Sequence, residues 1–153
     1  MINKDIFNID HIYFDVNVSS QKEAFKYIAQ KFVENGVATD VKACYKGLKH
    51  REKEGSTGFN DGVAIPHARI DAISKAGVFI FKFSNGIDWD SIDRSLVQVA
   101  IALAIPNDVS GDQHIKILSS IARKLVNEQF RHNLTNVKNK AELFQLINQV
   151  DII

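Results

Sequence analysis

The chain contains very little cysteine and almost no excess of charge of either sign. Its one cysteine, Cys44, excludes an intramolecular disulfide and argues against a cysteine-rich zinc site. Nineteen basic and eighteen acidic side chains leave a formal net charge of +1, without the basic excess of nucleic-acid binders and polybasic membrane anchors. The longest apolar run, residues 99–105, is far shorter than the roughly 20 residues that span a bilayer. We therefore expect a cytoplasmic protein with no nucleic-acid partner and no direct membrane insertion.

The length and the hydrophobic pattern predict one α/β domain over residues 1–153. The predicted strands are residues 11–17, 63–65, 76–83 and 97–105, with a turn at 84–86. The predicted helices run from Ser20 to Asn35, from Asp40 to Gly55, from Asp112 onward, near 127–134 and near 139–150. This order predicts an α/β (α+β) fold in which a mixed β-sheet is flanked by helices on both faces.

Cys44 lies on the apolar face of the second predicted helix, together with Val41, Tyr45 and Leu48. A cysteine in such a position packs as a small apolar side chain more often than it reacts. We therefore expect an inert thiol that carries no covalent intermediate.

His67 is the residue with the strongest indication of chemistry. It follows a short apolar strand and Pro66, whose ring restricts the backbone at the end of that strand. Open α/β sheets bind their ligands at strand ends, and a neutral imidazole is a nucleophile that can carry a group covalently. The alternative is a histidine in an ordinary loop.

Two further residues have properties suited to an anionic group. His114 falls in the first turn of the helix predicted after Asp112, where free amides and the helix dipole favour an anion and a neutral ring. Arg51 lies where the second helix ends, and its planar guanidinium could hold two phosphoryl oxygens. The alternatives are a surface histidine and a solvated run of charges.

Other kinds of active site have weaker support. The sequence contains no GxxxxGK[ST] or GxGxxG phosphate loop, no HExxH or CxxC metal motif and no GxSxG elbow. Three ligands suffice for a catalytic zinc, so His67, His114 and an acidic residue could in principle form one in a zinc-dependent hydrolase. Because no local ligand spacing supports that site, we expect neither a metal nor a cofactor.

Several segments together resemble one known family. They are Leu48-x-x-Arg51-Glu52, the run from Thr57 through Gly62-Val63-Ala64-Ile65-Pro66-His67, Gly86-Ile87-Asp88-Trp89, and His114-Ile115-Lys116-Ile117-Leu118-Ser119. This combination resembles the fructose/mannitol-type EIIA component, the EIIA type-2 domain, of the bacterial phosphoenolpyruvate-dependent sugar phosphotransferase system. The resemblance extends from about residue 10 to the end of the chain.

The resemblance implies a phosphotransferase that works as a phosphocarrier. His67 would be the phosphohistidine intermediate, His114 the histidine that positions the phosphoryl group, and Arg51 the residue that stabilises it. Phospho-HPr would be the donor, and a cysteine of a IIB component, acting with a membrane IIC, would be the acceptor. A regulatory switch of the nitrogen-related type, which acts by binding a partner, is the alternative.

One departure from the family pattern concerns the loop before His67. Asn60 stands where the family usually has glycine, and the pair Asn60-Asp61 brings polarity and a charge into the loop. Asparagine tolerates left-handed backbone better than most residues, so the loop can keep its path. A carboxylate close to a phosphohistidine would repel it.

Overall fold

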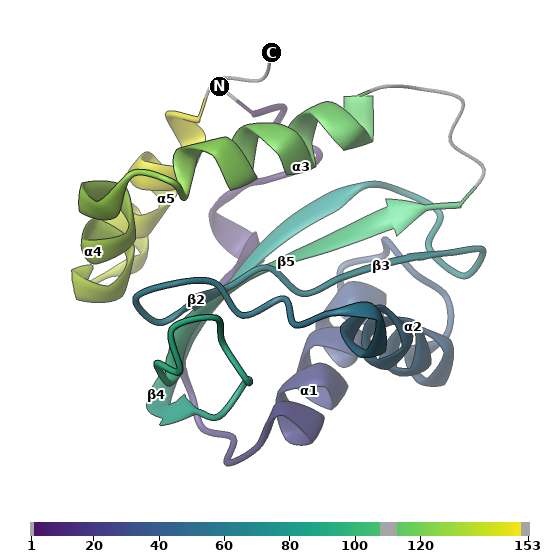
Figure 1. Ribbon diagram of the computed structural model, residues 1–153. Helices are drawn as coiled ribbons and strands as arrows, with labels where there is room; N and C mark the ends of the chain where they lie inside the picture. The colour runs from purple at the N-terminus through teal and green to yellow at the C-terminus, as the bar shows by residue number, and fades with distance from the viewer. Residues whose placement is uncertain (1, 108–112, 151–153) are drawn as a thin grey trace.

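The described residues form a five-stranded sheet that lies between two layers of helices (Figure 1). The computed structural model describes residues 2–107 and 113–150, without the side chains of residues 113–115, 117 and 118. The strands are β1 (Ile12–Val16), β2 (Val63–Ala64), β3 (His67–Ile70), β4 (Gly77–Ile87) and β5 (Val97–Pro106). The helices are a 3-10 turn (Ile9–His11), α1 (Gln21–Glu34), α2 (Val41–Glu54), α3 (Gln113–Lys124), α4 (Glu128–Asn136) and α5 (Lys140–Asn148).

The sheet is mixed, as the sequence predicts. β1 pairs with β4 in parallel, and β4 pairs with β5 antiparallel. β2 and β3 follow one another along the other edge of β5, and both run parallel to it. β5 is therefore the strand that joins the two halves of the sheet.

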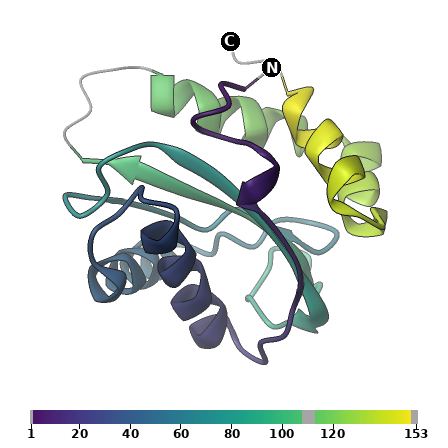
Figure 2. The ribbon, with the colours of Figure 1, turned by 180° about the vertical axis from the view of Figure 1, so that it is seen from behind.

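Helices cover both faces of the sheet, which Figure 2 shows from behind. α1 and α2 lie on one face, where the buried core includes Phe25, Phe32, Phe79 and Trp89. α3, α4 and α5 lie on the other face, where the core includes Ile80, Leu125, Leu134 and Ile147. Burial on both sides explains why β4 and β5 are nearly continuous apolar runs in the sequence. The predicted α/β (α+β) architecture is confirmed.

Two predictions about the strands are wrong. The first is the turn at residues 84–86, because β4 continues through these exposed residues to Ile87, which pairs with Val97 of β5. The second is the number of strands after α2, because residues 67–70 form β3, a strand that is not among those predicted. This four-residue segment is too short to show an alternating pattern of its own, and it becomes a strand by pairing with the edge of β5.

The predicted helices are present, with one boundary outside the described residues. Ser20 and Asp40 cap α1 and α2 by accepting hydrogen bonds from the amides of Glu23 and Ala43. The cap expected at Asp112 precedes α3 and lies outside the described residues. None of the described helices combines the length and the apolarity that a membrane crossing requires.

Cys44 is fully buried between α2 and the sheet, and it is not bonded to another cysteine. Burial, with a smaller effect of the nearby Asp40 carboxylate, raises the pKa of its thiol to about 11. Only about one thiol in a thousand is then ionised at pH 8. The structure therefore places Cys44 in the core, as predicted.

We expect Cys44 to react with iodoacetamide only when the protein unfolds. At pH 8 the folded chain should stay unmodified for hours, because both the thiolate and the access to it are lacking. The same chain in urea, as the control, should be alkylated within minutes. Intact mass spectrometry measures both reactions, and rapid labelling of the folded protein would contradict the packing described here.

Candidate active site around His67

Residues 57–65 form a tight hairpin that ends two residues before His67. We call it the 57–65 hairpin. The Phe59 amide donates to the Val63 carbonyl at 2.7 Å, and the Ile65 amide donates to the Thr57 carbonyl at 2.9 Å. At the tip, Asp61 and Gly62 have φ values of 57° and 83°. Glycine enters this left-handed region freely, and aspartate enters it more readily than most residues.

The base of the hairpin is fixed to the end of α2. The Glu52 carboxylate accepts hydrogen bonds from the Thr57 amide at 2.8 Å and from the Thr57 hydroxyl at 2.5 Å. The buried Trp89 donates its indole N–H to the same hydroxyl at 3.0 Å. These contacts engage both carboxylate oxygens of Glu52 and hold the base of the hairpin against the end of α2.

His67 is half-buried, and both nitrogens of its ring have partners. Nδ1 lies 2.9 Å from the Ile65 carbonyl oxygen, and the Arg51 Nε–H donates to Nε2 at 3.1 Å. A guanidinium can only donate, so Nε2 must accept and the ring proton must sit on Nδ1. The ring is therefore held as the tautomer whose free electron pair, the potential nucleophile, is on Nε2.

The surroundings of His67 favour its neutral form. Burial lowers the pKa of His67 below its ordinary value of 6.5 and outweighs the raising effect of the hydrogen bond to Ile65. The positive charge of Arg51 lowers the pKa further, whereas the carboxylates of Glu52 and Glu54 raise it. The net direction is downward, so the ring is uncharged at pH 7 and can act as a nucleophile.

Arg51 is the second predicted site residue, and the fold brings it to His67 as the sequence analysis expects. Its Nη1 donates to the Gly55 carbonyl at 2.9 Å, which holds the guanidinium across the end of α2. The remaining N–H groups can receive an anionic group beside Nε2. His114, the third predicted residue, is the second residue of α3, and its side chain lies outside the described part of the structure.

The other histidines have surroundings of their own. His11 is buried, with Nδ1 3.0 Å from the Val78 carbonyl oxygen and its ring stacked on Phe79 at 4.1 Å, as expected of a structural residue. His132 lies with Asp61 and Glu128, and one potential ligand atom from each lies within 4.8 Å of the others. Among the described residues, this is the group of three whose spacing would suit a metal, and it does not include His67.

The charge that Asp61 brings into the hairpin has a counter-charge. The Arg131 Nε–H donates to Asp61 Oδ2 at 2.9 Å. Thr57 and Trp89 belong to the segments that resemble the family, whereas Arg131 lies in none of them. The one local signal for the hairpin is the dipeptide Asp61-Gly62, which is typical of tight turns between strands.

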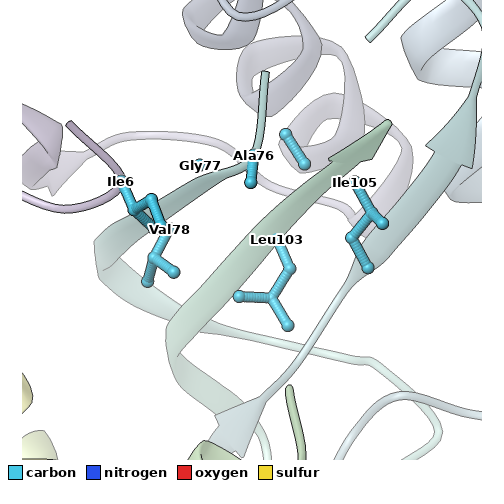
Figure 3. Close-up of a pocket in the computed structure, with 7 residues that line it drawn as sticks. Ile6, Ala76, Gly77, Val78, Leu103 and Ile105 are labelled. Atoms are coloured by element: carbon cyan, nitrogen blue, oxygen red, sulfur yellow. The ribbon is translucent and has the colours of Figure 1, made fainter. Parts of the chain in front are cut away.

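A small hollow lies between the start of β4 and the end of β5 (Figure 3). Its lining includes Ile6, Val78, Leu103 and Ile105, and every side chain that lines it is apolar. A substrate that reacts by acid–base or phosphoryl chemistry needs polar groups, which these side chains do not provide. This hollow therefore offers no group for such chemistry.

We expect replacement of Arg51 to raise the pKa of His67. Arg51→Gln removes a positive charge and some of the burial, and both changes favour the protonated ring. Arg51→Lys, as the control, keeps the charge and should shift the pKa less. NMR titration of the His67 ring measures the change, and an Arg51→Gln variant with an unchanged or lower pKa would contradict the described electrostatics.

Comparison with known proteins identifies a family that this chain matches. Residues 5–150 match the family model for the phosphoenolpyruvate-dependent sugar phosphotransferase system, EIIA 2. The fructose-specific EIIA component of the phosphotransferase system of Haloferax volcanii is 30% identical, with 86% of this chain and 85% of that protein covered.

Two solved structures have the same fold. The nitrogen regulatory protein IIA-Ntr of Neisseria meningitidis aligns with a TM-score of 0.85 and 27% identity, covering 94% of this chain and 97% of that one. Enzyme IIAMTL of Escherichia coli, solved in complex with phosphorylated enzyme IIBMTL, aligns with a TM-score of 0.76 and 19% identity, covering 93% and 96%. The chain therefore belongs to the EIIA type-2 family of the phosphoenolpyruvate-dependent sugar phosphotransferase system, and its role is one of phosphoryl transfer.

Proposed function

We propose that this chain is a phosphocarrier that receives a phosphoryl group on His67 from phospho-HPr and passes it to a cysteine of a IIB component. The membrane IIC component would then take up the sugar. The observation that carries the proposal is the state of His67, whose Nδ1–H is bonded to Ile65 while the electron pair of Nε2 faces Arg51. Membership of the EIIA family supplies the reaction class.

The first transfer follows from this geometry. The lone pair of Nε2 attacks the phosphorus of phospho-HPr, and the phosphorus–nitrogen bond of the donor breaks with its electron pair moving to the donor ring. A donor ring that is protonated on its other nitrogen leaves as neutral imidazole. His67 becomes a phosphoimidazolium whose Nδ1–H stays bonded to the Ile65 carbonyl, so the proton does not have to move.

Arg51 changes its partner during this step. In the free chain its Nε–H donates to Nε2, the atom that forms the new bond. Once that electron pair is used, the N–H groups of the guanidinium are free to bind phosphoryl oxygens. Phosphoryl transfer depends mainly on positioning and on stabilisation of charge, which a fixed guanidinium provides.

The onward step to IIB is supported by the buried state of Cys44. Because its thiol lies in the core, this chain has no cysteine of its own to receive the phosphoryl group. In a transport role, the acceptor cysteine would therefore come from a IIB partner. The complex described for the Escherichia coli mannitol protein is an assembly of this kind.

A regulatory role is the second candidate. The alignment with the nitrogen regulatory protein of Neisseria meningitidis has a TM-score of 0.85 and covers nearly the whole of both chains. Phosphorylation of His67 would then control the binding of a regulated partner, with no need for a IIB acceptor. Transfer from the phosphorylated chain to purified IIB components distinguishes the two roles.

We expect one phosphoryl group per chain after incubation with phosphoenolpyruvate, enzyme I and HPr. The group should be labile in acid and stable in alkali, as phosphoramidates are, and His67→Ala should abolish it because the nucleophile is gone. Intact mass spectrometry at neutral or basic pH measures the group. His50→Ala, which removes a histidine with an 81% exposed side chain, is the control and should be phosphorylated normally. Undiminished phosphorylation of His67→Ala would disprove the assignment.

We expect His114→Ala to be phosphorylated at His67 but to transfer the group onward about 100- to 1,000-fold more slowly, the usual effect of losing one preorganised donor. His114→Gln keeps a neutral donor and should recover part of the rate. Single-turnover transfer to a IIB component, with the site mapped by fragmentation, is the measurement. Phosphate on His114, or normal onward transfer by His114→Ala, would contradict this assignment of roles.

A further inference from the structure

Arg131 is a buried cation that is not part of the group around His67. Only 11% of its side chain is exposed. Its Nε–H donates to Asp61 Oδ2 at 2.9 Å, and its Nη1 donates to the carbonyl oxygens of Leu125 at 2.6 Å and Val126 at 3.1 Å. The guanidinium carbon also lies 5.9 Å from the centre of the Phe59 ring. A buried charge is costly unless it is paired and hydrogen-bonded, so these contacts determine where the guanidinium lies.

The partners of Arg131 belong to two segments that are far apart in the sequence. Phe59 and Asp61 are at the tip of the 57–65 hairpin, which extends toward α4 in Figure 1 and in the opposite view of Figure 2. Leu125 and Val126 follow directly after α3, the helix whose second residue is His114. Arg131 thus connects the hairpin that precedes His67 to the helix that carries the other predicted histidine.

The hairpin tip is also held from a second direction. The Asp61 amide donates to Asp93 Oδ2 at 3.0 Å, and the Gly62 amide donates to the Ser95 hydroxyl at 3.1 Å. The hydrogen bond from the Asp61 amide, with those from Ser95, lowers the pKa of Asp93 to about 2, so the acceptor stays ionised at neutral pH. A non-glycine residue with positive φ persists only where its surroundings fix it, as these do for Asp61.

The two strands of the hairpin connect its tip to His67. The hydrogen bonds between Phe59 and Val63 and between Thr57 and Ile65 make the two strands move together. The carbonyl of Ile65, at the far end of this ladder, is the group that orients the His67 ring. This ladder is the path that connects the position of Asp61 to the orientation of the His67 ring.

We propose that Asp61 and Arg131 are positioning residues for phosphoryl transfer at His67, because their ion pair fixes the 57–65 hairpin against the end of α3. The inference rests on the proposed function. Neither residue reacts, and each acts through the Ile65 carbonyl. The charge that Asp61 brings into this loop thereby serves to hold the hairpin, because Arg131 neutralises it.

Three variants separate this role from general damage to the fold. Asp61→Gly removes the carboxylate while allowing the left-handed backbone, and Asp61→Asn keeps that backbone preference together with an oxygen that can accept from Arg131. Arg131→Lys leaves the hairpin sequence intact but removes the forked donor that holds both segments. Glu34→Gln, which breaks the Lys31–Glu34 pair of 3.1 Å on α1, is the matched control for loss of an ion pair.

The measurement is single-turnover phosphorylation at several concentrations of phospho-HPr. Asp61→Gly and Arg131→Lys should each lower the maximal rate about 10- to 100-fold, because misplacement of a reacting atom by a fraction of an ångström to an ångström has effects of this size. The concentration of phospho-HPr at half-maximal rate should change much less. Asp61→Asn should recover only part of the rate, because it keeps an acceptor for Arg131 but not the negative charge. The Asp61→Gly/Arg131→Lys double variant should be no slower than the slower of the two single variants, and Glu34→Gln should match the wild type.

Hydrogen exchange provides a readout that does not depend on phosphorylation. The amides of Phe59 and Ile65 should exchange about ten-fold faster in Asp61→Gly and in Arg131→Lys, while thermal unfolding still shows a folded protein. If these amides or the maximal rate are unchanged in both variants, the positioning role is wrong. A wild-type chain that phospho-HPr does not phosphorylate would instead disprove the proposed function, and the exchange rates would still decide whether the ion pair holds the hairpin.

Discussion

The lack of an amide hydrogen on Pro66 is the constraint on which the arrangement at His67 depends. Strand pairing along one edge of β5 stops after Ala64 and starts again at His67, and the Pro66 carbonyl bridges the gap by accepting from the Leu103 amide. The Ile65 carbonyl, which lies in this gap, can accept from His67 Nδ1. A break of two residues in the sheet edge thus fixes both the backbone and the ring of the same histidine.

The sequence predicts best those parts of the fold that are determined by residues close together in the chain. Ser20 and Asp40 cap their helices through amides three residues further on, so nearby residues alone signal where α1 and α2 begin. Residues 84–86 have turn-forming side chains, yet they extend β4 because Ile87 pairs with Val97. Nothing within those three residues indicates a partner ten positions away, and the same is true of β3, which depends on the edge of β5.

The sequence and the family resemblance pick out candidate residues of the site but not their geometry. The family resemblance picks out His67 and Arg51, but their contact depends on how closely α2 approaches β3. A Cβ at Gly47 would lie 3.1 Å from Ile70 and 3.2 Å from Ala68, so the absence of a side chain there allows the close packing that lets Arg51, one turn later, reach Nε2. Arg131 is 70 positions from Asp61, and no local pattern relates the two.

The bonded Nδ1 of His67 has a consequence for the order of events in a phosphocarrier. With one ring nitrogen engaged by Ile65, Nε2 is the single atom through which a group can enter and leave. A donor and an acceptor that both need this atom cannot be bound productively at once. Such a chain must bind its donor and its acceptor one after the other. Fast dissociation of each partner therefore allows more transfers per unit time, and tight binding of either partner would slow the overall transfer.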